Sequence, residues 1–326
     1  MNTIGKAVKY LLALALMALP FIVWLKWNAL YDWYRLRGYT PPANIVQLAR
    51  QDTMTSKGQH LFYINHPLLL SSVSDFRQDC PENEQTIVLG CYHPPEDGIY
   101  IYNVSDSDLA GIQQVTAAHE MLHGAYGRLS SSQKASVDAM LNDFYNNDEH
   151  NQRIIDEINL YKKTEPNSVM DEMHSVLGTE EGDLPQPLEN YYSQYFTNRQ
   201  AVIGFANSYQ AAFTSRTNQI NADDAQLATM KQQITNQEAS LQSQSAQINS
   251  DRARLDGEKN SGDIATYNAG VDNFNDEVNK YNADYASLRA QITAYNNLVA
   301  ARNSIAAEIQ TLDNAIDTRL TTQSAQ

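Results

Sequence analysis

Cysteine is nearly absent from this chain of 326 residues, in which Cys80 and Cys91 are the only two. Two cysteines are too few for a disulfide scaffold, and without a C-x-x-C pair neither a thiol redox motif nor a cysteine-based zinc site is expected. One bridge is feasible if the chain doubles back between them, and two free thiols in the cytosol are the alternative. Because an apolar segment precedes them, we favour the bridge, which predicts an oxidising space outside the cytoplasm.

Basic residues are also few. The chain has 23 Lys and Arg against 38 Asp and Glu, so its net charge is -15. A surface of this sign repels phosphate backbones, and we expect no nucleic-acid partner. Apolar residues make up 42% of the chain and charged residues 19%, which argues against a wholly disordered protein. The length suffices for two domains, or for one domain with a long extension.

The first 40 residues contain a long apolar run. Between Lys9 and Lys26 lie 16 uncharged residues, somewhat fewer than the roughly 20 that span a bilayer. A cleaved signal peptide is the alternative, but no small-x-small cleavage site follows the run. We therefore predict a single-pass transmembrane signal anchor within residues 1–40, in the cell membrane, with the next domain outside the cytoplasm. An interfacial aromatic belt is predicted from Trp24, Trp27, Tyr31, Trp33 and Tyr34.

Residues 41–187 are predicted to form an α+β domain. Three short runs rich in Ile, Val, Tyr and Phe are strand candidates, at residues 61–64, 85–89 and 99–104. The last two are separated by G-C-Y-H-P-P-E-D-G, which predicts a hairpin connection. Apolar periodicity predicts helices at 132–147 and 152–163, and a short helix or ordered approach at 43–57.

The strongest chemical motif is H-E-M-L-H, formed by His119, Glu120 and His123 within an apolar 3-4-3 pattern typical of a partly buried helix. Residues four apart lie on one helix face, so both imidazoles can bind one metal ion. Zn²⁺ accepts imidazole nitrogen, and the neighbouring Glu120 carboxylate can act as general base. Two core histidines are the alternative, but a Glu between them would be costly to bury. We predict a zinc site with His119 and His123 as ligands and Glu120 as a catalytic residue.

A third ligand is expected in the segment N-S-V-M-D-E-M-H-S-V-L-G, from Asn167 onward. Glu172 is preferred because, on a helix, it shares the inward face with apolar residues, where a buried carboxylate needs a cation. His174 is the second choice as a ligand, and it could instead act catalytically on the substrate carbonyl. Asp171 and His150 remain further alternatives. As oxyanion stabilisers, the candidates are His174, Tyr191, Tyr192 and Tyr195.

These features, H-E-M-L-H after a small sheet and a later helix with Glu172 in the pattern E-x-x-S, resemble the gluzincin metallopeptidases over about Leu61 to Gly182. The metzincin continuation with a nearby third His is absent. The resemblance implies a compact bacterial membrane-anchored zinc endopeptidase that acts on a protein or peptide substrate, with a two-His-one-Glu site. A membrane-tethered scaffold with a structural or inactive zinc site is the alternative, and zinc-dependent hydrolysis of a non-peptide amide is a third.

Residues 188–326 lack cysteine and, beyond Pro185 and Pro187, lack proline as well. Their Gln, Asn, Ser and Ala content is typical of disorder, but the apolar spacing is not. From Phe213 to Leu255 apolar residues recur every seven positions, and a 3-4 repeat follows from Ile264. We predict an antiparallel coiled-coil hairpin that turns within the Gly-containing break from Asp256 to Gly262. It could serve as a spacer, as a docking arm for a protein partner, or in self-association.

Overall fold

The computed structural model describes residues 27–81, 87–93 and 98–319 of the chain. It is 77% helical, and the sheet has three short strands. The predicted α+β class is therefore wrong, because helices build most of the core. Residues 61–64 contribute to this error in the fold class. They were predicted as a strand and form the end of helix α4 (Ser56–Ile64). The Thr55 side chain caps that helix by accepting the Gly58 N–H at 3.1 Å, and the cap outweighs the strand preference of the apolar run.

The predicted N-terminal transmembrane helix is the second correction to the fold class. The run between Lys9 and Lys26 lies outside the described residues. In the part of the chain that the structure does describe, no helix is both long enough and apolar enough to cross a bilayer. The first described helix is α2 (Trp27–Leu36), which carries part of the predicted aromatic belt.

The sheet has the strand order β1-β3-β2, with β1 at Leu68–Leu70, β2 at Gly90–His93 and β3 at Gly98–Tyr102. β1 runs parallel to β3 and β2 antiparallel to it. The strand predicted at 99–104 is confirmed as β3. The strand predicted at 85–89 is wrong for its described residues, because 87–89 form no strand and β2 begins at Gly90, inside the predicted hairpin connection. Residues 85 and 86 lie outside the described part. Helix α5 (Val73–Asp79) contacts β1 and β3.

Helix α6 (Ile112–Gly127) is the centre of the core. It contacts β2 and β3, helix α3 (Ala43–Gln51) and α4, and most extensively helix α9 (Val169–Glu180). Ala117, Ala118, Met121 and Leu122 on α6 are completely buried. Burial of these side chains fixes the rotation of the helix about its axis, and with it the direction of the motif residues.

Three further helices complete the core around α6 and α9. The predicted helices at 132–147 and 152–163 are confirmed as α7 (Ser131–Asn147) and α8 (Gln152–Thr164), and α10 (Gln186–Tyr192) follows. A capping box of Ser130 and Gln133 begins α7, and the Asn151 side chain caps α8. These polar caps determine where the two helices begin, and both helices begin within one residue of the predicted positions.

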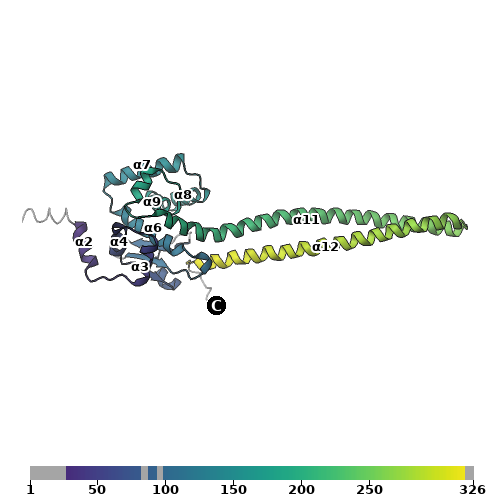
Figure 1. Ribbon diagram of the computed structural model, residues 1–326, viewed down its shortest axis with the longest axis horizontal. Helices are drawn as coiled ribbons and strands as arrows, with labels where there is room; N and C mark the ends of the chain where they lie inside the picture. The colour runs from purple at the N-terminus through teal and green to yellow at the C-terminus, as the bar shows by residue number, and fades with distance from the viewer. Residues whose placement is uncertain (1–26, 82–86, 94–97, 320–326) are drawn as a thin grey trace, which may run out of the picture. The chain divides into compact units, whose positions relative to one another are not determined.

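Helices α11 (Arg199–Ser261) and α12 (Ile264–Ile316) are the two long helices in Figure 1. The chain forms two compact units. The first comprises the described residues through Ala211 together with those from Asn314, and the second is Ala212–Asp313. The second unit is the predicted helical hairpin, and it turns at Gly262, whose φ of 81° favours glycine.

Contacts within the second unit show that the two arms are antiparallel. Leu241, Ile248 and Leu255 of the predicted heptad are buried. The polar seam position Gln244 donates to Asp284 of the other arm at 2.7 Å. An ion pair joins the Arg302 guanidinium to Asp224 at 3.0 Å. Polar residues at seam positions suggest a weakly paired arm, but here Gln244 forms a hydrogen bond between the two arms.

Candidate metal centre

His119 and His123 lie on α6 and Glu172 lies in the first turn of α9, in a region where these two helices pack together. The Nε2 atom of His119 is 3.6 Å from one Glu172 oxygen, and Nε2 of His123 is 3.7 Å from the other. The three possible ligand atoms lie within 4.8 Å of one another. Two ligands about 2.1 Å from a tetrahedral zinc ion are roughly 3.4 Å apart. The spacing therefore fits one zinc ion, and the structure brings the three predicted ligands together.

The charges around this triad also favour a cation. Burial alone would lower the pKa of His123, but the Glu172 and Asp171 carboxylates outweigh it and raise the pKa to about 10. For His119, too, burial is outweighed, in this case by the hydrogen bond and charge of Glu172, and the pKa is raised. Burial would raise the pKa of Glu172, yet the two imidazoles hold it below its usual value. A bound divalent ion would meet the same demand for positive charge.

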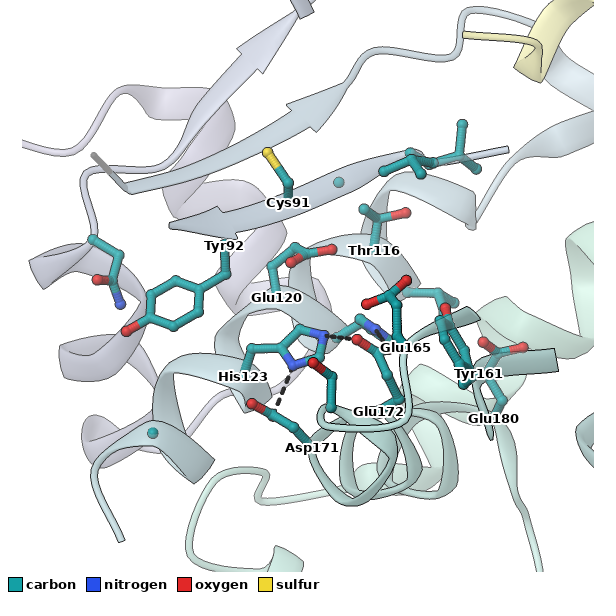
Figure 2. Close-up of a pocket in the computed structure, with 18 of the residues that line it drawn as sticks. Cys91, Tyr92, Thr116, Glu120, His123, Tyr161, Glu165, Asp171, Glu172 and Glu180 are labelled. Carbon is teal, nitrogen blue, oxygen red and sulfur yellow. Dashed lines mark hydrogen bonds and ion pairs between the residues drawn. The ribbon is translucent and has the colours of Figure 1, made fainter. Parts of the chain in front are cut away.

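Asp171, considered from the sequence as a possible third ligand, instead contacts the ring of His123. Its Oδ1 is 2.8 Å from Nδ1 of His123 (Figure 2), while Nε2 of His123 faces Glu172. A carboxylate on the far nitrogen fixes the tautomer in which Nε2 is free to bind a metal. The adjacent pair Asp171 and Glu172 therefore serves the same histidine from two sides. The D-E dipeptide in the sequence was the only signal for this arrangement.

Glu120 is 5% exposed and lines the same cavity, opposite strand β2. A Cβ on Gly90 of β2 would lie 2.5 Å from Oε1 of Glu120 and 2.5 Å from Cγ2 of Thr116. The missing side chain at Gly90 is what lets the strand pass this close to the carboxylate. Glycine inside an apolar segment was a sequence signal for such an approach, but it did not identify Glu120 as the partner.

The cavity has a volume of about 720 Å³ and is rich in acidic groups (Figure 2). Its lining includes one guanidinium, from Arg128, and six carboxylates, from Glu120, Glu157, Glu165, Asp171, Glu172 and Glu180. Burial is the main cause that raises the pKa of Glu157 to about 7, followed by the charge of Glu180. Tyr161 also lines the cavity, and its hydrogen bond helps to lower the pKa of Glu172. Glu157 and Glu180 are both paired with Arg153, at 2.8 and 2.9 Å, and the other lining carboxylates favour a cation over an anion.

His174 is not brought to the cavity. It is fully buried on α9, where Nε2 lies 2.9 Å from the Tyr191 hydroxyl and the ring packs against Tyr126 and Tyr192. Burial, with a smaller effect from His123 and His119, lowers the pKa of His174 to about 3. Tyr192 donates its hydroxyl to the His174 carbonyl at 2.7 Å, and Tyr195 is fully buried. These predicted oxyanion stabilisers belong to an aromatic cluster inside the core, and His150 is exposed outside the site.

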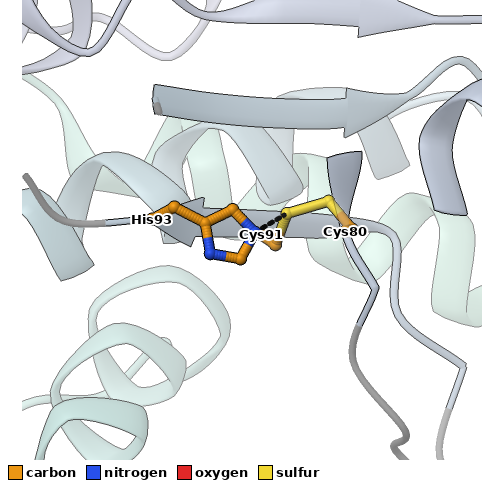
Figure 3. A group of neighbouring side chains, drawn as sticks. All are labelled: Cys80, Cys91 and His93. Atoms are coloured by element: carbon orange, nitrogen blue, oxygen red, sulfur yellow. Dashed lines mark hydrogen bonds between the residues drawn. A yellow bond between two sulfur atoms is a disulfide. The ribbon is translucent and has the colours of Figure 1, made fainter. Parts of the chain in front are cut away.

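Cys80 and Cys91 form a disulfide (Figure 3), as favoured from the sequence. The bridge ties the residue after α5 to β2, the strand beside Glu120. His93 lies next to it, with Nε2 3.3 Å from Sγ of Cys91 and 3.0 Å from the Asp79 carbonyl oxygen. These three side chains have metal-ligand spacing, but the sulfur atoms bond each other, so the thiolates that a metal requires are absent.

Comparisons with protein-family models, with curated proteins and with solved structures find no match to this chain.

Proposed function

We propose that this protein is a zinc-dependent peptidase of the gluzincin type. The observation that carries the proposal is the meeting of His119, His123 and Glu172, with Glu120 beside them in a cavity. A purely structural zinc site needs ligands, but it needs neither an open cavity nor a further carboxylate beside the three ligands. In this protein the cavity and the further carboxylate, Glu120, are both present. The donor set of two imidazoles and one carboxylate is suited to zinc in a catalytic rather than a closed site.

The residues have separate roles in the proposed reaction. His119, His123 and Glu172 would hold the ion, and Asp171 keeps His123 in the correct tautomer. When bound, zinc supplies Lewis-acid chemistry that acidifies water and polarises a carbonyl group. The Glu120 carboxylate accepts a proton from the attacking water and returns it to the leaving amine. The Tyr161 hydroxyl donates to Glu172 in this structure, and we assign it the developing oxyanion as its acceptor once Glu172 holds the ion.

The charge of the cavity indicates the substrate class. Arg153 pairs with two of the six lining carboxylates, Glu157 and Glu180. The other four favour peptides with Lys or Arg near the scissile bond over acidic ones. The disulfide supports a location outside the cytoplasm, because such bridges persist in oxidising compartments. Mass spectrometry of unreduced protein taken from cells should therefore find neither cysteine alkylated.

The test combines elemental analysis with hydrolysis of a quenched-fluorescence peptide library by the full chain. We expect about one zinc per chain. Glu120→Gln should keep the zinc and lose hydrolysis, and Glu172→Ala should lose both. Tyr161→Phe should keep the zinc and lower kcat by roughly 10²- to 10³-fold. Glu238→Gln, an exposed change on the hairpin, is the matched control and should alter neither.

Two outcomes would contradict the proposal. Zinc that binds without any hydrolysis by the unaltered chain would favour a scaffold protein with a structural metal site. Absence of zinc from a correctly folded chain would remove the metal centre altogether.

A further inference from the structure

Helix α2 presents an aromatic surface to solvent. Trp27, Leu30, Trp33 and Tyr34 are 61%, 47%, 62% and 72% exposed. Their spacing of three, six and seven residues from Trp27 places them on neighbouring faces of one helix. We call these four residues the aromatic face. Large apolar side chains gathered on one exposed helix face indicate a binding surface rather than a random distribution.

The opposite side of α2 is fixed to the core, so the aromatic face has a set direction. Asp32 pairs with Arg128 at 2.6 Å and with His60 at 2.8 Å. The Arg35 side chain donates to the Ile64 carbonyl at 2.9 Å, and the Arg35 carbonyl lies 2.7 Å from Nε2 of His66. Burial would raise the pKa of Asp32, but Arg128 and His60 hold it below its usual value. These contacts hold the inner side of α2 against the core, so the aromatic face points outward.

The same helix borders the metal cavity. Trp27, Asn28 and Tyr31 line it together with His119, Glu120 and His123. Whatever the aromatic face binds must therefore lie close to the entrance of the cavity.

The chemistry of this region points to lipid. Trp and Tyr rings with one apolar and one polar side are the residues preferred at bilayer interfaces. The local charge has the opposite sign to that of the whole chain. Residues 27–40 contain two basic side chains, Arg35 and Arg37, and one acidic one, Asp32, a balance of +1, which leaves 21 basic and 37 acidic, or -16, for the rest of the sequence. The Arg37 guanidinium lies 5.2 Å from the Trp33 ring centroid, beside the aromatic face. In the sequence, α2 also follows directly on the uncharged run from Tyr10 to Leu25.

We propose that the aromatic face of α2 seats in the headgroup region of a phospholipid bilayer that contains anionic lipid, with the metal cavity opening at the membrane surface. Arg37 then meets lipid phosphates while the rings lie among the glycerol groups. The acidic remainder of the first unit is repelled from the same surface, which orients the protein. Together with the proposed peptidase activity, this would make membrane-proximal segments the substrates. The lipid contact itself does not depend on that activity.

Tryptophan fluorescence gives a direct test, because the chain has three Trp residues, Trp24, Trp27 and Trp33. In the full chain with Trp24→Phe and Trp27→Phe, Trp33 is the only emitter. Vesicles of phosphatidylcholine and phosphatidylglycerol, brominated at different acyl positions, should shift its emission to shorter wavelength. Quenching should be strongest with the bromine nearest the headgroup. Vesicles of phosphatidylcholine alone should quench less.

Three outcomes would overturn the proposal: no vesicle binding, vesicle binding without quenching of Trp33, or a blue-shifted Trp33 before lipid is added. The last would mean that a second copy or residues 1–26 cover the aromatic face. The substitution pair Leu30→Ser and Tyr34→Ser should reduce quenching of Trp33 several-fold while circular dichroism stays unchanged. Tyr285→Ser, at a residue of the hairpin that is 49% exposed, is the matched control and should leave the quenching unchanged.

Discussion

At the scale of single residues, the candidate site depends on carboxylates whose neighbours determine their roles. Glu120, Asp171 and Glu172 all line one cavity. Asp171 faces Nδ1 of His123, Glu172 faces both Nε2 atoms, and Glu120 lies below Gly90. In the proposed reaction the three carboxylates therefore have different roles. Asp171 orients His123, Glu172 is a metal ligand, and Glu120 is the base.

Asp171 offers a test of the orienting contact. We expect Asp171→Ala to weaken zinc binding about 10- to 100-fold, because His123 loses the acceptor that fixes its tautomer. Competition with a chelator at fixed pH measures this change. Asp156→Ala, at an exposed position of α8, is the control. An unchanged zinc affinity in Asp171→Ala would show that the 2.8 Å contact does not support the metal site.

Asp52 makes stability depend on pH. It is fully buried, neither carboxylate oxygen has a hydrogen-bond partner among the described residues, and burial raises its pKa well above 3.8. The folded chain then keeps this proton to higher pH than the unfolded chain does. The free energy of unfolding contributed by Asp52 is therefore greatest at low pH and falls as pH rises above 3.8.

We expect Asp52→Asn, which cannot ionise, to melt at a higher temperature than the unaltered chain at pH 7. This advantage should disappear at or below about pH 4, where Asp52 is protonated in both states. Thermal denaturation followed by circular dichroism at the two pH values is the measurement. An equal or lower melting temperature for Asp52→Asn at pH 7 would contradict the burial argument.

At the scale of elements, the site depends on how closely α9 approaches α6. A Cβ on Gly178 of α9 would lie 2.5 Å from Cδ1 of Leu122 on α6 and 2.7 Å from Cε1 of Tyr192. These contacts are tighter than side chains tolerate, so Leu122 and Tyr192, both fully buried, must shift or the two helices must separate. His119 and His123 lie on α6 and Glu172 lies on α9. A separation of the two helices would therefore also increase the distances between the three possible ligands.

We therefore expect Gly178→Ala to lower the free energy of unfolding by about 1–3 kcal/mol and to weaken zinc binding. Gly204→Ala is the matched control, because Gly204 lies in α11 and nothing is within 4 Å of its added Cβ. That change should stabilise the chain by up to about 1 kcal/mol. Urea denaturation and zinc titration of both variants test this. Equal effects from the two substitutions would refute the proposed role of close helix packing.

At the scale of the whole molecule, the chain keeps its chemistry and its long helices in separate units. Every residue of the candidate metal centre belongs to the first unit, and Ala212–Asp313 forms the second. Buried Leu241, Ile248 and Leu255 with polar pairs across the arms provide the second unit with its own packing. The two units should therefore differ in what destabilises them.

We expect an isolated 212–313 fragment to give a helical far-UV circular dichroism spectrum. Leu241→Ala should lower its melting temperature, because a buried seam Leu contributes roughly 2–3 kcal/mol. Ile264→Ala, at a residue that is 55% exposed, should leave the melting temperature nearly unchanged. A coil spectrum from the unaltered fragment would mean that the hairpin needs the first unit in order to fold.

Local patterns in the sequence determined much of this protein. The seven-residue and 3-4 apolar repeats were sufficient to predict the hairpin, and apolar periodicity predicted α7 and α8. The motif H-E-M-L-H, whose histidines are four positions apart on one helix, determined that both side chains face the same way. These features follow from interactions within one helix or between neighbouring turns, which the chain encodes at short range.

Tertiary packing decided the rest. The run at 61–64 forms the end of a helix, and the first strand lies later in the chain, at Leu68–Leu70. Burial against α6 suits either structure, and a cap determined which one formed. Glu172 and His174 were both plausible from spacing alone. The turn of α9 directs Glu172 to the histidines and buries His174 among tyrosines. Contacts between helices distant in sequence determine such directions, and no local pattern records them.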